Sequence, residues 1–160
     1  MTIRHYCYLS VSECEISWFK VGGLCFRVYA GNISVTWSEA RSFCKSRGGD
    51  LAVVDSESKR KVIAIHLHNA SLNYPKFSIN QAYIGLQKLD RWQWPGGSTI
   101  TSNYWHRGEQ DVLKVGESAV VTRRSSAWKL AKEKPSDRGF LCQTNERKNI
   151  LLNMGVSTFV

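Results

Sequence analysis

The order of the elements expected along the chain predicts an α+β domain, in which helices and strands occupy separate stretches of sequence. Apolar residues cluster around Gly22-Gly23 as in a β-hairpin, and two helix-like stretches follow. Short apolar segments separated by turn residues then continue to residue 142, as expected for strands. With 160 residues, 42% of them hydrophobic and 22% charged, the chain has the length and composition of one globular domain.

The first half of the chain supplies the hairpin and both helices. Thr36 and Glu39 have the spacing of a capping box, which predicts that a helix begins after Thr36. Gly48-Gly49 is typical of the end of that helix, and Ser56 or Ser58 is expected to begin a second one. The apolar positions that define these elements are Trp18, Phe19, Leu24, Phe26, Val28 and Tyr29 in the hairpin, Trp37, Ala40 and Cys44 in the first helix, and Val62, Ile63 and Leu67 in the second.

The second half of the chain is expected to form short strands separated by loops. Residues 68–81 are polar and contain Pro75, which predicts a loop. Residues 1–13 lack a clear pattern and are expected to be a leader or linker, residues 14–142 to form the domain, and residues 143–160 to be a tail outside it. The expected strands are 51–54, 82–86, 92–94, 119–121, 128–130 and 139–142.

Five cysteines constrain the fold, namely Cys7, Cys14, Cys25, Cys44 and Cys142. Their spacing does not match that of zinc sites, and disulfides explain it better. Cys14 and Cys25 flank the hairpin turn, so a bridge there would join the open end of the hairpin. Cys44 and Cys142 would then close a long loop, which in the chain-entropy model stabilises the fold by roughly 4–5 kcal/mol. Cys7 is left either as a free thiol, as the partner of a segment outside this sequence, or as the link in a disulfide-bonded dimer.

Disulfides indicate an oxidising compartment, and two acceptor triplets for N-glycosylation are consistent with it. These triplets are Asn32-Ile33-Ser34 and Asn69-Ala70-Ser71. We therefore expect an extracellular domain that is secreted, lies in a matrix or belongs to the ectodomain of a membrane protein. The sequence contains no apolar run long enough to cross a membrane.

Charge and motifs narrow the class of partner. The formal net charge of +9 favours anionic ligands. Nucleic acid is not expected, because no recognition motif is present and the compartment does not fit. The sequence has no Gly-x-Ser-x-Gly, paired-carboxylate or phosphate-loop pattern, and Cys44 lies on the apolar stripe of a helix, where it could not serve as a nucleophile. We therefore expect neither catalysis nor a cofactor.

A series of short motifs occurs in a fixed order between residues 14 and 142. In chain order they are Cys14-x10-Cys25-Phe26, Trp37-Ser-Glu-Ala40-Arg-Ser-Phe-Cys44, Gly48-Gly49-Asp50-Leu51-Ala-Val-Val-Asp55-Ser56-Glu57, Tyr83-Ile84-Gly85-Leu86, Trp92-Gln-Trp94-Pro-Gly-Gly, Asn103-Tyr104-Trp105 and Arg138-Gly139-Phe140-Leu141-Cys142. Together they resemble the C-type lectin-like domain in its long form, which has an N-terminal hairpin. The resemblance implies a double-loop fold, in which two helices flank small antiparallel sheets and a long loop carries the binding surface. It agrees with both proposed disulfides.

The calcium-binding triplets of this family are altered here. Sugar-binding members hold calcium with oxygens of a Glu-Pro-Asn or Gln-Pro-Asp triplet and a Trp-Asn-Asp triplet. The first position reads Glu109-Gln110-Asp111, and the second reads Trp128-Lys129-Leu130. The family's proline is normally cis, and a non-proline cis bond costs about 3–4 kcal/mol, so the loop is not expected to keep that shape. Lys129 would also place a positive charge beside the ion. We therefore expect no metal at this position. The cysteines of the family's inner disulfide are missing as well.

A basic segment follows the expected strand at 119–121, and the resemblance places it on or near the ligand-facing end. Its cations are Arg123, Arg124, Lys129, Lys132, Lys134 and Arg138, opposed by Glu133 and Asp137. It is either a docking site for an anionic ligand or a solvated loop that keeps the domain soluble. The expected function is calcium-independent binding of a protein or an anionic glycan, such as a glycosaminoglycan, within a receptor or matrix protein. The candidate contacts are Glu109, Gln110, Asp111, Arg123, Arg124 and Lys129.

Two other functions fit the same residues. One is a calcium-dependent, carbohydrate-binding lectin with a rearranged site that uses Glu109, Asp111 and Glu117. The other is a structural or cell-adhesion module of an extracellular matrix protein, in which Cys7 links two chains.

Overall fold

The computed structural model of the chain describes residues 8–30, 34–73, 79–101, 103–109, 115–131 and 138–152, with residues 8–12 and 148–152 described for the backbone alone. Helices and strands together form an α+β fold, as predicted. In chain order they are β1 (Tyr8–Glu13), β2 (Phe19–Val21), β3 (Leu24–Tyr29), α1 (Trp37–Ser46), β4 (Asp50–Leu51), α2 (Glu57–Asn73), β5 (Gln81–Lys88), β6 (Trp92–Gln93), β7 (Ser118–Thr122), β8 (Trp128–Leu130), β9 (Arg138–Asn145) and β10 (Arg147–Leu152).

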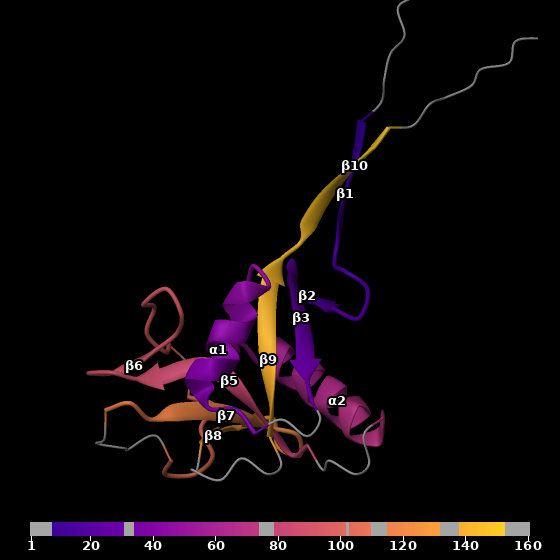
Figure 1. The fold of residues 1–160 in the computed structure, drawn as a ribbon. Coiled ribbons are helices and arrows are strands. Elements are labelled where there is room, and N and C mark those ends of the chain that lie inside the picture. The colour runs from indigo at the N-terminus through magenta and orange to yellow at the C-terminus, as the bar shows by residue number, and fades with distance from the viewer. Residues whose placement is uncertain are drawn as a thin grey trace, which may run out of the picture.

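Most strands belong to one eight-stranded sheet in the order β2-β3-β9-β5-β7-β8, with β4 added to β9 and β6 added to β5. The resemblance implied antiparallel sheets, and among the named strands of the described residues every pair but one is antiparallel. The exception is the parallel pair of β5 and β9, which aligns Gln81 with Arg138. Because β5 and β9 run parallel while their other neighbours run antiparallel, the sheet is mixed (Figure 1).

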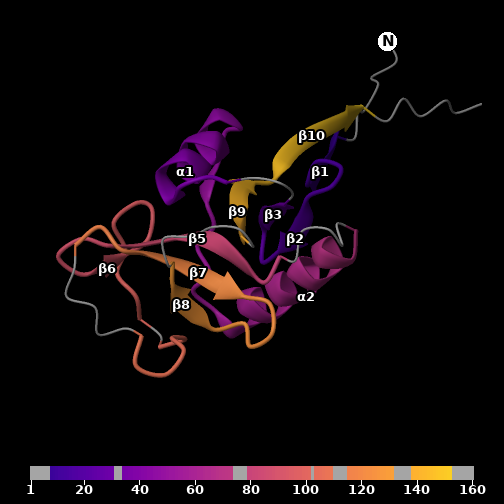
Figure 2. The same ribbon diagram turned by 60° about the horizontal axis from the view of Figure 1, so that its bottom comes forward.

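Alternating side chains of the central strands divide the core into two clusters. In β5, Ala82, Ile84 and Leu86 belong to the cluster that contains Ile63 and Leu67 of α2. Tyr83 joins the second cluster, which α1 covers with Trp37, Ala40 and Cys44. Helix α1 therefore packs on one face of the sheet and α2 on the other, and the two helices lie apart from each other in Figures 1 and 2.

Helix α1 begins and ends as the sequence predicts. The hydroxyl oxygen of Thr36 accepts a hydrogen bond from the backbone N–H of Glu39, and the carboxylate of Glu39 accepts one from the backbone N–H of Thr36. The backbone N–H and the hydroxyl of Thr36 both donate to this carboxylate, which stabilises its charged form and lowers the pKa of Glu39. At the other end, Gly48 has a φ of 78°, which favours glycine. A Cβ at Gly49 would collide with the backbone of Gln143 in β9.

Both predicted disulfides are present, Cys14–Cys25 and Cys44–Cys142. The first joins the segment before β2 to β3, and the second joins α1 to β9 across 98 residues of sequence. They agree with the expected oxidising compartment. Cys7 lies outside the described residues, so the disulfide-linked dimer stays a prediction.

Two segments differ from the expectations. Helix α2 continues to Asn73, so residues 68–73, expected in a loop, are helical. Pro75 excludes helix only near its own position, and the polar residues before it lie on the exposed side of α2. At the chain ends, β1 pairs with β10, and this two-stranded ribbon projects from the body of the domain (Figures 1 and 2). The sequence pattern predicted neither strand. Strand β9 runs to Asn145, and the domain limits at residues 14 and 142 stay a prediction.

Candidate functional site

Residues 123–131 of the basic segment lie at the end of the sheet, where β7 turns back into β8, and Arg138 is buried at the start of β9. Lys132, Glu133, Lys134 and Asp137 lie outside the described residues. The backbone N–H of Ser126 donates to the carbonyl of Thr122 (3.0 Å), and the N–H of Thr122 donates to the carbonyl of Ala127 (3.0 Å). The hydroxyl groups of Thr122 and Ser125 are also hydrogen-bonded, 2.7 Å apart. These bonds make a tight turn, and Arg124 is exposed at its tip.

A second segment pairs with β8 from the other side. The backbone N–H of Trp128 donates to the carbonyl of Tyr104, and the N–H of His106 donates to the carbonyl of Trp128, each at 2.8 Å. Trp105 thereby forms a parallel bridge with Trp128. This pairing fixes His106 next to β8, although Lys129 lies more than twenty positions further along the chain.

Basic side chains from these segments meet at a hollow of about 400 Å³. Arg124, Lys129 and His106 supply its positive or protonatable groups, and no Asp or Glu occurs among the described residues that line it. The remaining lining residues are neutral and polar, namely Asn80, Gln81, Thr122 and Ser125. The hollow combines charge with hydrogen-bond donors, which suits a negatively charged oxygen-rich group.

Arg123 is directed away from this hollow. Its guanidinium donates from Nη1 to the hydroxyl of Ser71 (2.7 Å) and from Nη2 to Oδ1 of Asn80 (2.9 Å). Ser71 lies in the last turn of α2, and Asn80 directly precedes β5. Of the three predicted basic contacts, Arg124 and Lys129 therefore share the hollow, while Arg123 joins three segments of the scaffold.

The carboxylate of Glu109 is also part of the scaffold. Its Oε2 accepts a hydrogen bond from the backbone N–H of Leu130 (2.8 Å), and its Oε1 lies 4.0 Å from Nδ1 of His106. This contact attaches the loop to β8. Gln110 and Asp111, the other predicted contacts in this loop, lie outside the described residues. Glu117, which the alternative calcium site would use, directly precedes β7. Within the described part of the chain, no group of three or more His, Cys, Asp or Glu side chains is placed to hold a metal ion.

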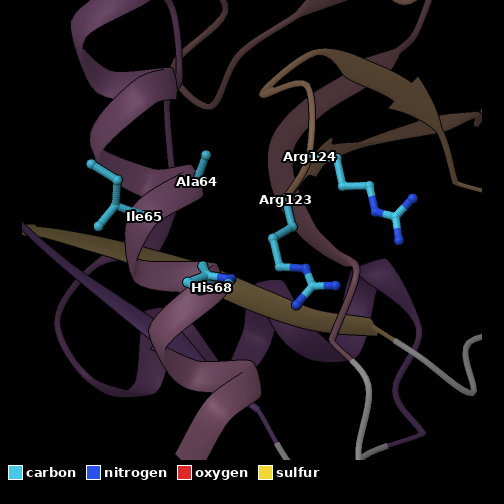
Figure 3. Close-up of a pocket in the computed structure, with 5 residues that line it drawn as sticks. All are labelled: Ala64, Ile65, His68, Arg123 and Arg124. Carbon is cyan, nitrogen blue, oxygen red and sulfur yellow. The ribbon is translucent and has the colours of Figure 1, made fainter.

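A further hollow of about 470 Å³ lies between α2 and the turn after β7 (Figure 3). Its lining residues are Ala64, Ile65, His68, Arg123 and Arg124. In Figure 3, Ala64 and His68 face the arginines, whereas Ile65 projects away from them. Arg124 lines both hollows, so a mainly apolar surface along α2 adjoins the cationic one.

Sequence reasoning missed His106, because its position beside the hollow depends on the pairing of its segment with β8.

Of the two predicted glycosylation sites, one lies within the described residues and the other does not. Asn69 is exposed on α2, and Asn32 lies outside the described residues. Among the described helices, none has both the length and the apolar composition needed to span a bilayer.

Comparisons with known proteins agree on one family. The family model for the lectin C-type domain matches residues 33–144. Among curated relatives, the galactose-specific lectin nattectin of Thalassophryne nattereri is 29% identical over 139 residues, which cover 85% of this chain and 83% of that protein. C-type lectin domain family 4 member G of Mus musculus is 22% identical over 134 residues, which cover 84% of this chain and 44% of that protein. C-type mannose receptor 2 of Homo sapiens is 30% identical over 113 residues, 69% of this chain and 7% of that protein.

Solved structures show the same fold. The C-type carbohydrate-recognition domain of cow CD23 matches with a TM-score of 0.65 and 19% identity, covering 84% of this chain and 98% of that one. A calcium-independent type II antifreeze protein matches with a TM-score of 0.61 and 19% identity, covering 86% and 98%. The family model covers well over half of the chain. The chain therefore belongs to the lectin C-type domain family.

Proposed function

We propose that this binding module recognises a sulfated polysaccharide without calcium, through the hollow formed by Arg124, Lys129 and His106. The observation that carries the proposal is the meeting of these three basic side chains at a hollow whose described lining contains no carboxylate. Two cations that line one hollow attract an anion more strongly than the same charges spread over a solvated loop.

The chemistry of the lining suits a sulfate group. The guanidinium of Arg124 can donate two parallel hydrogen bonds to the oxygens of one sulfate, whereas the ammonium of Lys129 acts as a point charge. Polar groups of Gln81 and Ser125 line the same hollow. Repeated sulfates along a polysaccharide would reach the other cations of the surface, consistent with the net charge of +9.

Calcium independence is supported by the use of Glu109. Calcium takes six to eight oxygen ligands in proteins, and carboxylates are the strongest of them. The Glu109 carboxylate already accepts a hydrogen bond from Leu130, and Lys129 stands where the family has an amide or carboxylate. The antifreeze protein with this fold is described as calcium-independent, so the scaffold does not require the ion.

The proposal can be tested by the salt concentration needed to elute the protein from heparin. Replacing Arg124 and Lys129 by Ala should lower that concentration clearly, since each lost contact reduces counterion release. The matched control replaces Lys45 and Arg91 by Ala, two exposed cations outside the hollow, with the same loss of charge. Equal elution of both variants would refute the proposal. Calcium and a chelator should leave wild-type elution unchanged, and titration calorimetry should show no calcium binding.

A protein ligand is the second candidate, favoured by the apolar hollow beside Arg124. Ala64, which faces the arginines, could contact an apolar side chain of the partner while Arg124 pairs with an acidic one (Figure 3). Replacing Ala64 by Asp would weaken binding to such a partner and leave heparin retention little changed. Domains of this family are generally binding modules, and we propose no catalytic role. We place the domain outside the cell, in a secreted, matrix or receptor protein, in agreement with its disulfides.

A further inference from the structure

The outward face of α2 exposes apolar side chains that the scaffold does not cover. Ile65 is 58% exposed and Leu72 is 64% exposed. They are seven residues apart, so they lie on the same face of the helix, separated by about 10 Å along its axis. The opposite face holds Ile63 and Leu67, which are buried in the core. An exposed pair of this kind increases the tendency of a protein to associate with itself unless something covers it.

Asn69 lies beside this pair. It follows Ile65 by four residues and precedes Leu72 by three, the spacings at which side chains on a helix are neighbours. Asn69 is exposed on the surface of the helix. With Ala70 and Ser71 it forms an acceptor triplet for N-glycosylation.

We propose that an N-linked glycan on Asn69 covers Ile65 and Leu72. The first sugar would stand between the two apolar side chains, with the C–H groups of its ring against them and its hydroxyls toward water. Because Ile65 projects away from Arg123 and Arg124, the glycan covers the outer side of α2 and leaves the cationic hollow open (Figure 3).

The transfer reaction uses a lipid-diphosphate-linked oligosaccharide as donor. Nδ2 of Asn69 forms a bond to the anomeric carbon, the bond from that carbon to the diphosphate breaks, and the lipid diphosphate leaves with the electron pair. One amide proton passes to solvent. In the folded protein, the Ser71 hydroxyl donates to the carbonyl of His68 (2.7 Å) and accepts from Arg123 (2.7 Å). The Ser71 hydroxyl of the triplet is therefore already hydrogen-bonded once α2 is complete, so transfer of the glycan takes place before this end of the helix forms.

The test is expression of the full chain behind a secretion signal in animal cells. Peptide mass spectrometry before and after glycan removal should find the glycan on Asn69. Asn69→Gln should lose it and shift toward earlier elution in size-exclusion chromatography, with more binding of a hydrophobic dye. The matched control is Asn73→Gln, which makes the same change at an exposed position of α2 outside any acceptor triplet. Ser71 is left unchanged because it holds Arg123.

Adding Ile65→Ser and Leu72→Ser to Asn69→Gln should return the protein to the elution of a monomer, slightly later than the glycosylated protein because the glycan is missing, and should lower dye binding to the level of the glycosylated protein. If Asn69→Gln fails to be secreted, enzymatic removal of the glycan from folded wild-type protein replaces it in the same measurements. An unmodified Asn69 in secreted protein would overturn the proposal. So would a deglycosylated protein that elutes and binds dye like the glycosylated one.

Discussion

Replacement of Arg123 by Ala should lower stability far more than replacement of its neighbour Arg124. The Arg123 guanidinium bonds to Ser71 and Asn80, and its backbone N–H donates to the Asn80 carbonyl (2.9 Å). The side chain therefore joins α2, the segment before β5 and the turn after β7. Arg124 is exposed at the tip of the turn.

The size of the effect follows from the two side-chain bonds. A hydrogen bond that involves a charged group contributes about 1.5–3 kcal/mol to stability, and Arg123 makes two. The side chain is only half-buried, so solvent replaces part of the loss. We expect the free energy of unfolding to fall by about 2–4 kcal/mol in Arg123→Ala, against about 0.5 kcal/mol or less in Arg124→Ala.

Urea unfolding followed by tryptophan fluorescence measures both changes, and an unchanged slope with denaturant would show that the two states remain comparable. Heparin retention should respond in the opposite order, because Arg124 lines the cationic hollow and Arg123 does not. Two variants of equal stability would refute the scaffold role of Arg123. A loss of heparin binding in Arg123→Ala without loss of stability would make it a ligand contact after all.

Two other predictions concern the core. Replacing Cys44 and Cys142 together by Ala should lower the free energy of unfolding by about 4.7 kcal/mol, the chain-entropy value for a loop of about 100 residues, and urea unfolding under non-reducing conditions would detect it. Burial lowers the pKa of His66 below its ordinary value of 6.5 as the ring stacks on Phe19, 3.6 Å between centroids. The unfolded chain then binds the proton more readily, so stability present above pH 6.5 is lost as the pH falls through the folded pKa. His66→Phe should reduce that dependence, and NMR titration of the imidazole protons would report the shift.

The local features of the fold were predictable because neighbouring residues determine them. Thr36 and Glu39 form their capping box within one turn of α1, and the sequence alone contains all of its groups. The disulfides were predictable because Cys14 and Cys25 flank one hairpin turn, which left only three cysteines for the second bridge. Each of these predictions rests on a short-range rule or on a small number of alternatives.

The features that were missed depend on contacts between distant segments. The parallel pairing of β5 with β9 aligns Gln81 with Arg138, and neither strand carries a pattern that names its partner. The β1–β10 ribbon likewise joins the two ends of the described chain. In α2, the polar character of residues 68–73 reflects exposure, which a helix surface and a loop share. Composition alone could not distinguish an exposed helical segment from a loop.

The candidate site was predicted in part for the same reason. Proximity in sequence placed Arg123, Arg124 and Lys129 in one group, yet successive residues of a tight turn point in different directions. The Arg123 side chain contacts α2, and of these three residues Arg124 and Lys129 line the hollow. Glu109 was predicted as a contact from its place in the altered triplet, and in the structure its carboxylate accepts a hydrogen bond from the backbone N–H of Leu130 in β8.

The cationic hollow depends on a residue that never touches it. Trp128 is fully buried, with its ring against Trp94, Tyr104 and Trp105. Side chains alternate along a strand, so placing Trp128 in the core sends Lys129 to the opposite side. The backbone of Trp128 also bonds to the segment that carries His106. One core position therefore sets both the direction of Lys129 and the location of His106.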